Sequence, residues 1–308
     1  MFPGHQDFYP YIVTGLALGG VYALSGVGIV VLYRATGVLN LAFGAIGAMG
    51  ALISWTLINH HGVPEWASYL VCVAFGGLVT FAYGVVLGPL LAHRDPLVKA
   101  TGTLGLTLIL LGLMSYFWSG VIARTMSLPT SGPGYTYHLG FADVDVTMTQ
   151  IIALAFGVVV TLGMSAFLRF TKLGTAMRAL ADDREITSTL GVPVRRVEAV
   201  AWLGSGLLAG AAGVLLADLV GLDSVTLTFL VISSLAAALI ARLRSLVATL
   251  FAGLAVGLAS ALLTPIVLWP NQTFSLSRYS GGAPFVIAIV TLLFLARRRV
   301  VSVSRTEG

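Results

Sequence analysis

Charged residues are scarce in this sequence. Asp, Glu, Lys and Arg make up 9% of its 308 residues, whereas soluble domains carry about 25%. With 57% hydrophobic residues, the chain has too little polar surface to coat a soluble globule. Because apolar runs of about 18 residues or more are typical of membrane spans, the composition predicts a polytopic membrane protein.

Reactive side chains are equally rare inside the apolar segments. The single cysteine, Cys72, has neither a disulfide partner nor the spacing of a metal ligand. The five histidines fall in expected loops or near the N-terminus, and no Asp, Glu, Lys or Arg lies in the middle of an expected span. We therefore expect no metal site and no catalytic residues, which disfavours a membrane enzyme. An ion-coupled carrier is disfavoured too, because such carriers usually keep ionisable residues at mid-membrane depth.

The sequence also lacks the G-x-x-x-x-G-K-[ST] loop that cradles phosphates, and neither Lys99 nor Lys172 has that context. We therefore expect this chain to bind no cofactor itself. If it transports a solute uphill, the energy must come from another subunit.

Nine apolar segments predict an all-α bundle of about 8–9 transmembrane helices. They cover residues 9–33, 38–58, 66–91, 100–122, 149–168, 198–219, 225–241, 246–268 and 283–296. The segment 225–241 is the shortest internal one, so we expect it to be tilted, broken or partly re-entrant. Glycines spaced i, i+4 favour close packing between helices, because small residues let two backbones approach. These pairs are Gly15/Gly19, Gly84/Gly88, Gly206/Gly210 and Gly253/Gly257.

The basic residues predict the orientation of the bundle. With the N-terminus outside, 15 of the 17 Lys and Arg residues fall on the cytoplasmic side, and only Arg124 and Arg278 fall outside. We therefore expect the N-terminus outside and the C-terminus in the cytoplasm. A single domain over 1–308 would have an external loop at 123–148, a long cytoplasmic loop at 169–197 and a cytoplasmic tail at 297–308. The same bias explains the net charge of +5, so no nucleic-acid partner is expected.

The stretch ALADDREITSTLG, residues 179–191, places four charges side by side within the long cytoplasmic loop. Apolar positions recur near helical spacing and predict one apolar face, at Leu173, Met177, Leu180, Thr187 and Leu190. Gly191 suits a left-handed helix end, and Pro193 prevents the helix from continuing. We therefore expect one capped helix over 175–190. A solvated connector is the alternative, and it does not explain the capping signals.

These residues carry a resemblance to a known family. LGTAMRALADDREITSTLGVPVRRVEAVAWLGSGLLAGAAGVLLA, residues 173–217, resembles the permease subunits of branched-chain amino acid ABC uptake systems. The family pattern G-x-x-[ML]-R-A-x-A-x-[DE], followed by Gly-[IV], is matched at Gly174, Arg178, Ala179, Ala181, Asp183, Gly191 and Val192. Residues 15–52 are similar to the family's first span and its Asn-x-Ala-x-Gly turn, matched at Asn40, Ala42 and Gly44. TLGLTLILLGL, residues 103–113, resembles its fourth-span motif.

The sequence departs from the family at three places. Phe43 stands where the family has His, and ALIARLRSLVATLFAG, with Arg242 and Arg244, replaces a Gly-Gly-x-Gly run. The frequent C-terminal Pro-x-Gly is replaced by RRRVVSVSRTEG. These departures leave the substrate open between branched-chain amino acids and other small polar solutes.

The resemblance implies a transport subunit rather than an enzyme, in the inner (plasma) membrane of a bacterium and surrounded by lipid. It implies a second related permease, two ATPase subunits that hold ATP and Mg, and an extracytoplasmic substrate-binding protein. The short helix would be the coupling helix that docks on an ATPase. Its expected contact and pivot residues are Gly174, Met177, Arg178, Leu180, Ala181, Asp182, Asp183, Gly191 and Pro193.

Polar and small residues of two segments are expected to line the translocation pathway. They are Asn40, Phe43, Gly44, Thr101, Thr103 and Thr107. Asn40 follows a glycine-containing break at 35–37, so it either satisfies the backbone of that break or lines the pathway. An autonomous channel or facilitator is the main alternative function. It explains the uncharged interior but gives no reason for a capped cytoplasmic helix.

Overall fold

The structure is a computed structural model that describes residues 8–91, 94–118, 124–126, 128–131, 133–139, 144–267, 286 and 289–290. Its long helices are α1 (Tyr9–Thr36), α2 (Phe43–His61), α3 (Glu65–Val86), α5 (Pro96–Phe117), α6 (Met148–Phe170), α9 (Val194–Val220) and α12 (Leu246–Val267). The shorter helices are α4 (Gly88–Leu91), α7 (Lys172–Asp182), α8 (Arg184–Thr189), α10 (Ser224–Phe229) and α11 (Val231–Ile240).

Five of these helices are long and apolar enough to cross a membrane: α1, α3, α5, α6 and α9. Shorter apolar helices accompany them at Ser224–Ile240 and Leu246–Leu262. The prediction of an all-α polytopic membrane protein is therefore confirmed. The count of nine spans and the orientation stay predictions, and the ninth segment, 283–296, falls largely outside the described residues.

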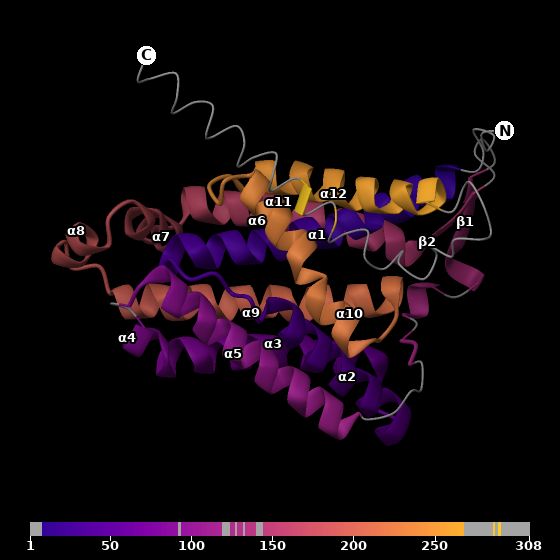
Figure 1. Ribbon diagram of the computed structural model, residues 1–308, viewed down its shortest axis with the longest axis horizontal. Helices are drawn as coiled ribbons and strands as arrows, with labels where there is room; N and C mark the ends of the chain where they lie inside the picture. Colours follow the sequence, from indigo (N-terminus) through magenta and orange to yellow (C-terminus); the bar gives the residue numbers. More distant parts are fainter. Residues whose placement is uncertain are drawn as a thin grey trace, which may run out of the picture.

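The helices form two groups that meet along α1 and α9. The first group packs α6, α11 and α12 around α1, and the second packs α2 and α3 on α9, with α5 against α2. Most helices run along the long axis of the molecule, with α7 and α8 at one end and the start of α1 at the other (Figure 1). The pair α10 and α11 links the two groups, because α10 packs on α2 and α5 whereas α11 packs on α1 and α12.

Glycines bring the helix backbones into contact at the main interfaces, as their spacing predicts. A Cβ atom added at Gly19 would lie 2.7 Å from the Cα of Leu254, where α1 meets α12. A Cβ added at Gly210 would lie 2.5 Å from the carbonyl oxygen of Cys72, where α9 meets α3. Gly88 differs, because no atom of the described chain lies within 4 Å of its added Cβ. Three of the four predicted glycine pairs therefore pack with both members against a neighbouring helix, and the fourth does so only through Gly84, which faces Trp202.

Short polar side chains fix where several helices begin. Thr147 and Gln150 form a capping box at the start of α6. Asp223 caps α10 by accepting a hydrogen bond from the backbone N–H of Thr226 at 2.7 Å. At the start of α7, the hydroxyl of Thr171 accepts a hydrogen bond from the N–H of Gly174 at 2.9 Å. These caps satisfy backbone donors that a helix N-terminus leaves unpaired.

The expected external loop contains a small antiparallel hairpin that the sequence did not reveal. Strand β1 (Thr136–Leu139) pairs with β2 (Val144–Thr147), with Thr136 opposite Thr147 and Leu139 opposite Val144. Val144 and Val146 are buried against Val13 of α1, so the hairpin lies on the end of the bundle opposite α8. Two 3₁₀ turns, Pro129–Ser131 and Pro133–Tyr135, precede it.

Several predicted segment limits are wrong. The second helix begins at Phe43 rather than at residue 38, because the chain is non-helical between α1 and Ala42. The third segment divides into α3 and α4, and the fourth helix already begins at Pro96. The short segment 225–241 was expected to be tilted, broken or partly re-entrant, and it is broken, with α10 and α11 meeting at Leu230.

The single helix predicted over 175–190 is also wrong. The structure has two helices, α7 and α8, separated at Asp183, whose φ and ψ are −152° and 113°. Asp183 leaves the helix because its carboxylate accepts a hydrogen bond from the N–H of Ile186 at 2.9 Å and so caps α8. The predicted end is correct, since Gly191 follows α8 with φ +82°.

Candidate functional site: a central cavity and a charged end

The chain between α1 and α2 is irregular although it is buried. Helix α1 ends at Gly37, which has φ +70° and donates a hydrogen bond to the carbonyl of Tyr33 at 2.7 Å. Residues 37–42, the first break, then run without helix through the interior, where Asn40 is 2% exposed. Buried backbone of this kind needs hydrogen-bond partners from the protein, because lipid offers none.

Two side chains supply the partners of the first break. The Oδ1 atom of Asn40 accepts a hydrogen bond from the N–H of Ala42 at 3.1 Å. The hydroxyl of Thr103 on α5 accepts from the N–H of Leu41 at 3.2 Å and lies 2.9 Å from the carbonyl oxygen of Leu39, to which it can donate. Asn40 and Thr103 therefore hold the shape of the first break. The Nδ2 atom of Asn40 is buried and has no hydrogen-bond partner in the described chain.

A second break lies beside the first one. Helix α10 ends and α11 begins at Leu230, and the hydroxyl of Thr228 just before this point is buried without a partner among the described residues. Gly44, near the start of α2, packs directly on the carbonyl oxygen of Thr228. The absence of a side chain at Gly44 is what lets the two breaks touch.

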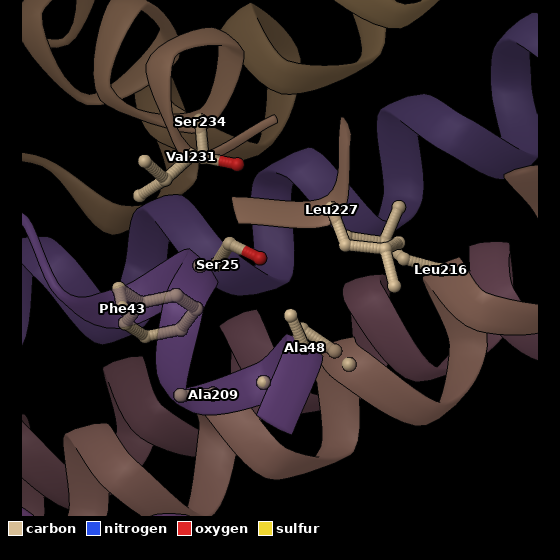
Figure 2. Close-up of a pocket in the computed structure, with 12 residues that line it drawn as sticks. Ser25, Phe43, Ala48, Ala209, Leu216, Leu227, Val231 and Ser234 are labelled. Carbon is tan, nitrogen blue, oxygen red and sulfur yellow. The ribbon is translucent and has the colours of Figure 1, made fainter. Parts of the chain in front are cut away.

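A small cavity lies where the two breaks meet α1 and α9 (Figure 2). Its lining residues are Ser25, Phe43, Gly44, Gly47, Ala48, Ala209, Ala212, Gly213, Leu216, Leu227, Val231 and Ser234. Only Ser25 and Ser234 offer polar side chains, and none of the lining residues is charged. The volume of about 10 Å³ is room for about one water molecule. Ligand sites usually measure about 300–1,000 Å³, so helices must separate before a solute passes.

The six residues predicted for the pathway fall into three groups. Phe43 and Gly44 line the cavity, whereas Asn40 and Thr103 support the first break. Thr101 is exposed and bonds to the carbonyl of Val98 at 2.9 Å, and Thr107 bonds to the carbonyl of Thr103 at 3.1 Å. These two threonines therefore serve their own helix.

Sequence reasoning missed the two hydroxyl groups of the cavity. Ser25 lies in the glycine-rich middle of α1, and Ser234 lies in the short helix α11. A serine inside an otherwise apolar span was the available signal for both. The sequence does not show that these two residues are neighbours, because they are far apart along the chain and come close only in the folded structure.

The segment 169–197, which we call the coupling loop after its predicted role, lies at the opposite end of α1 from the start of that helix (Figure 1). Met177 and Leu180 on α7 are only 3% and 7% exposed, and they pack in one core cluster with Leu168 and Val197. Their apolar surface is thus covered by the chain itself and is not free for a partner. Gly174 is also buried, against the backbone of Leu168, and it needs no unusual backbone angle.

The exposed residues of this loop are concentrated around α8. Ile186 is 60% exposed and Leu190 is 77% exposed. With the exposed carboxylates of Asp182 and Glu185, they form what we call the docking face. Ala181, Asp183, Gly191 and Pro193 are exposed around it, whereas Arg178 is half-buried.

One ion pair ties α8 to the next long helix. The Nη1 atom of Arg184 contacts the Oε1 atom of Glu198 on α9, with side chains that are 35% and 14% exposed. Lys99, near the start of α5, is close enough to act electrostatically on both groups. Glu198 lies near the start of α9, and the same helix lines the central cavity further along at Ala209, Ala212 and Gly213.

Comparisons with known proteins place the chain in a family. The profile described as branched-chain amino acid transport system / permease component matches residues 11–296. A probable branched-chain amino acid transport permease protein LivH of Methanocaldococcus jannaschii is 27% identical, over 88% of this chain and 85% of that protein. The high-affinity branched-chain amino acid transport system permease protein LivH of Escherichia coli K12 is 25% identical, over 94% of both chains.

A second type of relative matches over a shorter stretch. The high-affinity branched-chain amino acid transport system permease protein LivM of Salmonella typhimurium is 28% identical, over 64% of this chain and 50% of that protein. The family match covers the first break, the cavity and the coupling loop together. This chain belongs to the family of permease components of branched-chain amino acid ABC transport systems.

Proposed function

We propose that this chain is one of two permease subunits of an ABC importer in the inner membrane of a bacterium. The cargo would be a branched-chain amino acid, as the names of the LivH relatives suggest, or a related small polar solute. The likeness to both LivH and LivM proteins supports a second, related permease as the partner. Two ATPase subunits, holding ATP and Mg, and an extracytoplasmic substrate-binding protein would complete the importer.

The observation that carries this proposal is the meeting of two helix breaks at an uncharged, buried cavity. Breaks near mid-membrane depth are how many transporters build a binding site from backbone groups and small side chains. The cavity offers hydroxyls from Ser25 and Ser234 and the backbone around Gly44, without a charge that would hold an ion. Such a lining suits brief, weak contact with a zwitterion or neutral solute. Specificity would then reside mainly in the substrate-binding protein.

The charged end of the molecule would face the cytoplasm and receive the ATPase. Basic residues from separate helices converge there, including Arg34, Arg169 and Arg178, which agrees with the positive-inside rule. The docking face on α8 would contact the ATPase, and the Arg184–Glu198 pair would pass its movement to α9. Gly191, with its positive φ, would act as the pivot at the end of α8.

Uptake into proteoliposomes tests the proposal. The chain would be reconstituted with a candidate second permease, ATPase and binding-protein subunits, and uptake of radiolabelled leucine, isoleucine and valine would be followed with and without internal ATP. We expect accumulation only when ATP and the binding protein are present. An ATPase variant that binds but cannot hydrolyse ATP is the matched control and should give none.

The alternative functions predict different results in the same vesicles. Downhill uptake by this chain alone, without ATP, would identify a facilitator and overturn the proposal. Uptake driven by a proton or sodium gradient would identify an ion-coupled carrier. If ATP drives accumulation of another small solute but of no branched-chain amino acid, the importer assignment holds and the cargo assignment fails.

A further inference from the structure

Three arginines line a cleft at the charged end of the bundle that the transport mechanism does not use. The cleft has a volume of about 240 Å³ and is lined by Arg34, Ser165, Leu168, Arg169, Arg178, Ser245, Leu246 and Val247. It draws these residues from α1, α6, α7 and the start of α12. We call it the arginine cleft. Its volume is several times the roughly 30 Å³ that one water molecule takes up in the liquid.

The polar groups of the arginine cleft are incompletely satisfied. The Nε atom of Arg178 and the hydroxyl of Ser165 are buried and have no hydrogen-bond partner in the described chain. Arg34 donates to the carbonyl of Arg244 at 3.2 Å, and Arg178 donates to the hydroxyl of Thr175 at 3.3 Å. Within the described residues, no carboxylate forms a salt bridge with any of the three arginines of the cleft.

The nearest opposing charge does not neutralise the cleft. Asp182 attracts Arg34 electrostatically, but Arg178 is also close enough to repel it. Three guanidinium groups, with the hydroxyls of Ser165 and Ser245 beside them and no carboxylate among the lining residues, offer several N–H donors to the oxygens of a phosphate group. The arrangement is thus suited to an anion.

The position of the arginine cleft indicates what carries that phosphate. Arg34 and Arg169 lie in the last turns of α1 and α6, so the cleft sits where the long apolar helices end. Exposed apolar side chains lead away from it along the packed helices α6 and α12, at Leu162 with 55% exposure and Phe251 with 65%. Basic pockets between helices at the membrane boundary are suited to anionic lipid headgroups.

We propose that the arginine cleft binds the phosphate of an anionic phospholipid, whose acyl chains lie along α6 and α12. The headgroup would join Arg178 of α7 to Arg34 of α1 and Arg169 of α6. An anionic lipid would therefore brace the coupling loop against the bundle. Coupling would then depend on the lipid composition of the membrane.

Native mass spectrometry of the full chain in detergent, with any subunits that copurify, tests this site. The probes are dioleoyl phosphatidylglycerol and dioleoyl phosphatidylcholine, each added over a concentration series, with inorganic phosphate as a competitor. We expect tighter binding of phosphatidylglycerol, and no displacement by inorganic phosphate at millimolar concentration. Equal binding of the two lipids would overturn the proposal. Displacement by inorganic phosphate would do so too, because it would identify a soluble phosphate ligand.

Single substitutions locate the binding. Arg34→Gln, Arg169→Gln and Arg178→Gln should each weaken phosphatidylglycerol binding about fivefold, the effect of one basic residue near an anionic membrane. Arg195→Gln is the control, because it removes the same charge from an exposed position outside the cleft, and it should leave binding unchanged. Arg178→Lys keeps the charge and should bind more tightly than Arg178→Gln.

Two results would contradict the site. The first is an equal loss of phosphatidylglycerol binding in Arg195→Gln and Arg169→Gln. Both arginines are exposed, so neither substitution disturbs a buried residue. The second is unchanged lipid binding in all three cleft variants together with loss of the ATPase on purification. That pattern would assign the arginines to a carboxylate of the partner instead.

Discussion

Replacing Gly44 with alanine tests the contact between the two helix breaks. The added methyl group would overlap the carbonyl oxygen of Thr228, and this backbone atom cannot rotate away as a side chain could. Overpacking of this kind costs about 1–3 kcal/mol, while alanine in a helix gains up to about 1 kcal/mol over glycine. Because the overlap is with backbone, the upper half of that range applies, about 2–3 kcal/mol, and the net destabilisation of the closed arrangement is about 1–2 kcal/mol.

The expected consequences are measurable in two assays. A destabilisation of about 1–2 kcal/mol lowers the melting temperature by a few degrees in a chain of this size, which thermal unfolding followed by size-exclusion chromatography in detergent can detect. Since about 1.4 kcal/mol is a factor of ten in an equilibrium, ATP-driven uptake per assembled complex should fall about tenfold, because the contact must form each time the pathway closes.

Gly112→Ala on α5 is the matched control. Apart from its chain neighbours and its own helix backbone, no described atom lies within 4 Å of the added methyl group, so this variant should keep its uptake and should not lower the melting temperature. The reasoning fails if Gly44→Ala behaves like the unmodified protein, or if Gly112→Ala loses as much activity as Gly44→Ala does.

The contacts at the charged end make further outcomes testable. Arg184→Ala and Glu198→Ala should each lower the free energy of unfolding by about 1–2 kcal/mol, a value between those of exposed and buried ion pairs. If the two losses are strictly additive in the double variant, the two residues do not interact and the contact is contradicted. Met177→Ala should lower the free energy of unfolding by about 2–5 kcal/mol, because Met177 is buried. Ile186→Asp should keep the melting temperature but lose the copurifying ATPase. The docking face would be ruled out if Met177→Ala lost the ATPase without losing stability and Ile186→Asp lost stability without losing the ATPase. Arg242, with φ 56°, is strained, so Arg242→Gly should raise stability by about 0.5–1 kcal/mol, and an unchanged or lower melting temperature would argue against strain.

The charge pattern predicted one end of the fold well. Arginines far apart in the sequence, such as Arg34 and Arg178, line the same cleft in the structure. The reason is physical, since charged side chains are confined to the ends of apolar helices wherever those helices stand side by side. The glycine spacing was informative for a similar reason, because backbones approach only where a side chain is absent.

Helix limits were less predictable where apolar residues leave the helix. Val38 and Ala42 are as hydrophobic as the helices around them, so hydropathy could not show that the chain between them is irregular. Asp183 was expected inside one continuous helix, but its carboxylate accepts a hydrogen bond from the N–H of Ile186 and so caps α8. The local sequence alone does not show whether this aspartate lies inside a helix or caps one.

The candidate sites depended most on packing. The apolar face of α7 was visible in the spacing of Met177 and Leu180, but periodicity does not tell whether the same chain or a partner covers such a face. The cavity required the fold, because it joins Ser25 to Ser234. Phe43 and Gly44, taken from a family motif, were the two predicted pathway residues that line it.

Crosslinking at the docking face tests the central claim, that a separate ATPase drives this permease through α8. The only native cysteine, Cys72, is buried, so a cysteine introduced at Ile186 can be labelled selectively. With a reagent that joins a thiol-reactive group to a photoreactive group, which needs no cysteine on the partner, Ile186→Cys should crosslink to the ATPase in the assembled importer, in a yield that changes when ATP binds. Met177→Cys, which is buried, should not. The account is contradicted if Ile186→Cys forms no crosslink in a complex that still transports, or if Met177→Cys crosslinks equally well.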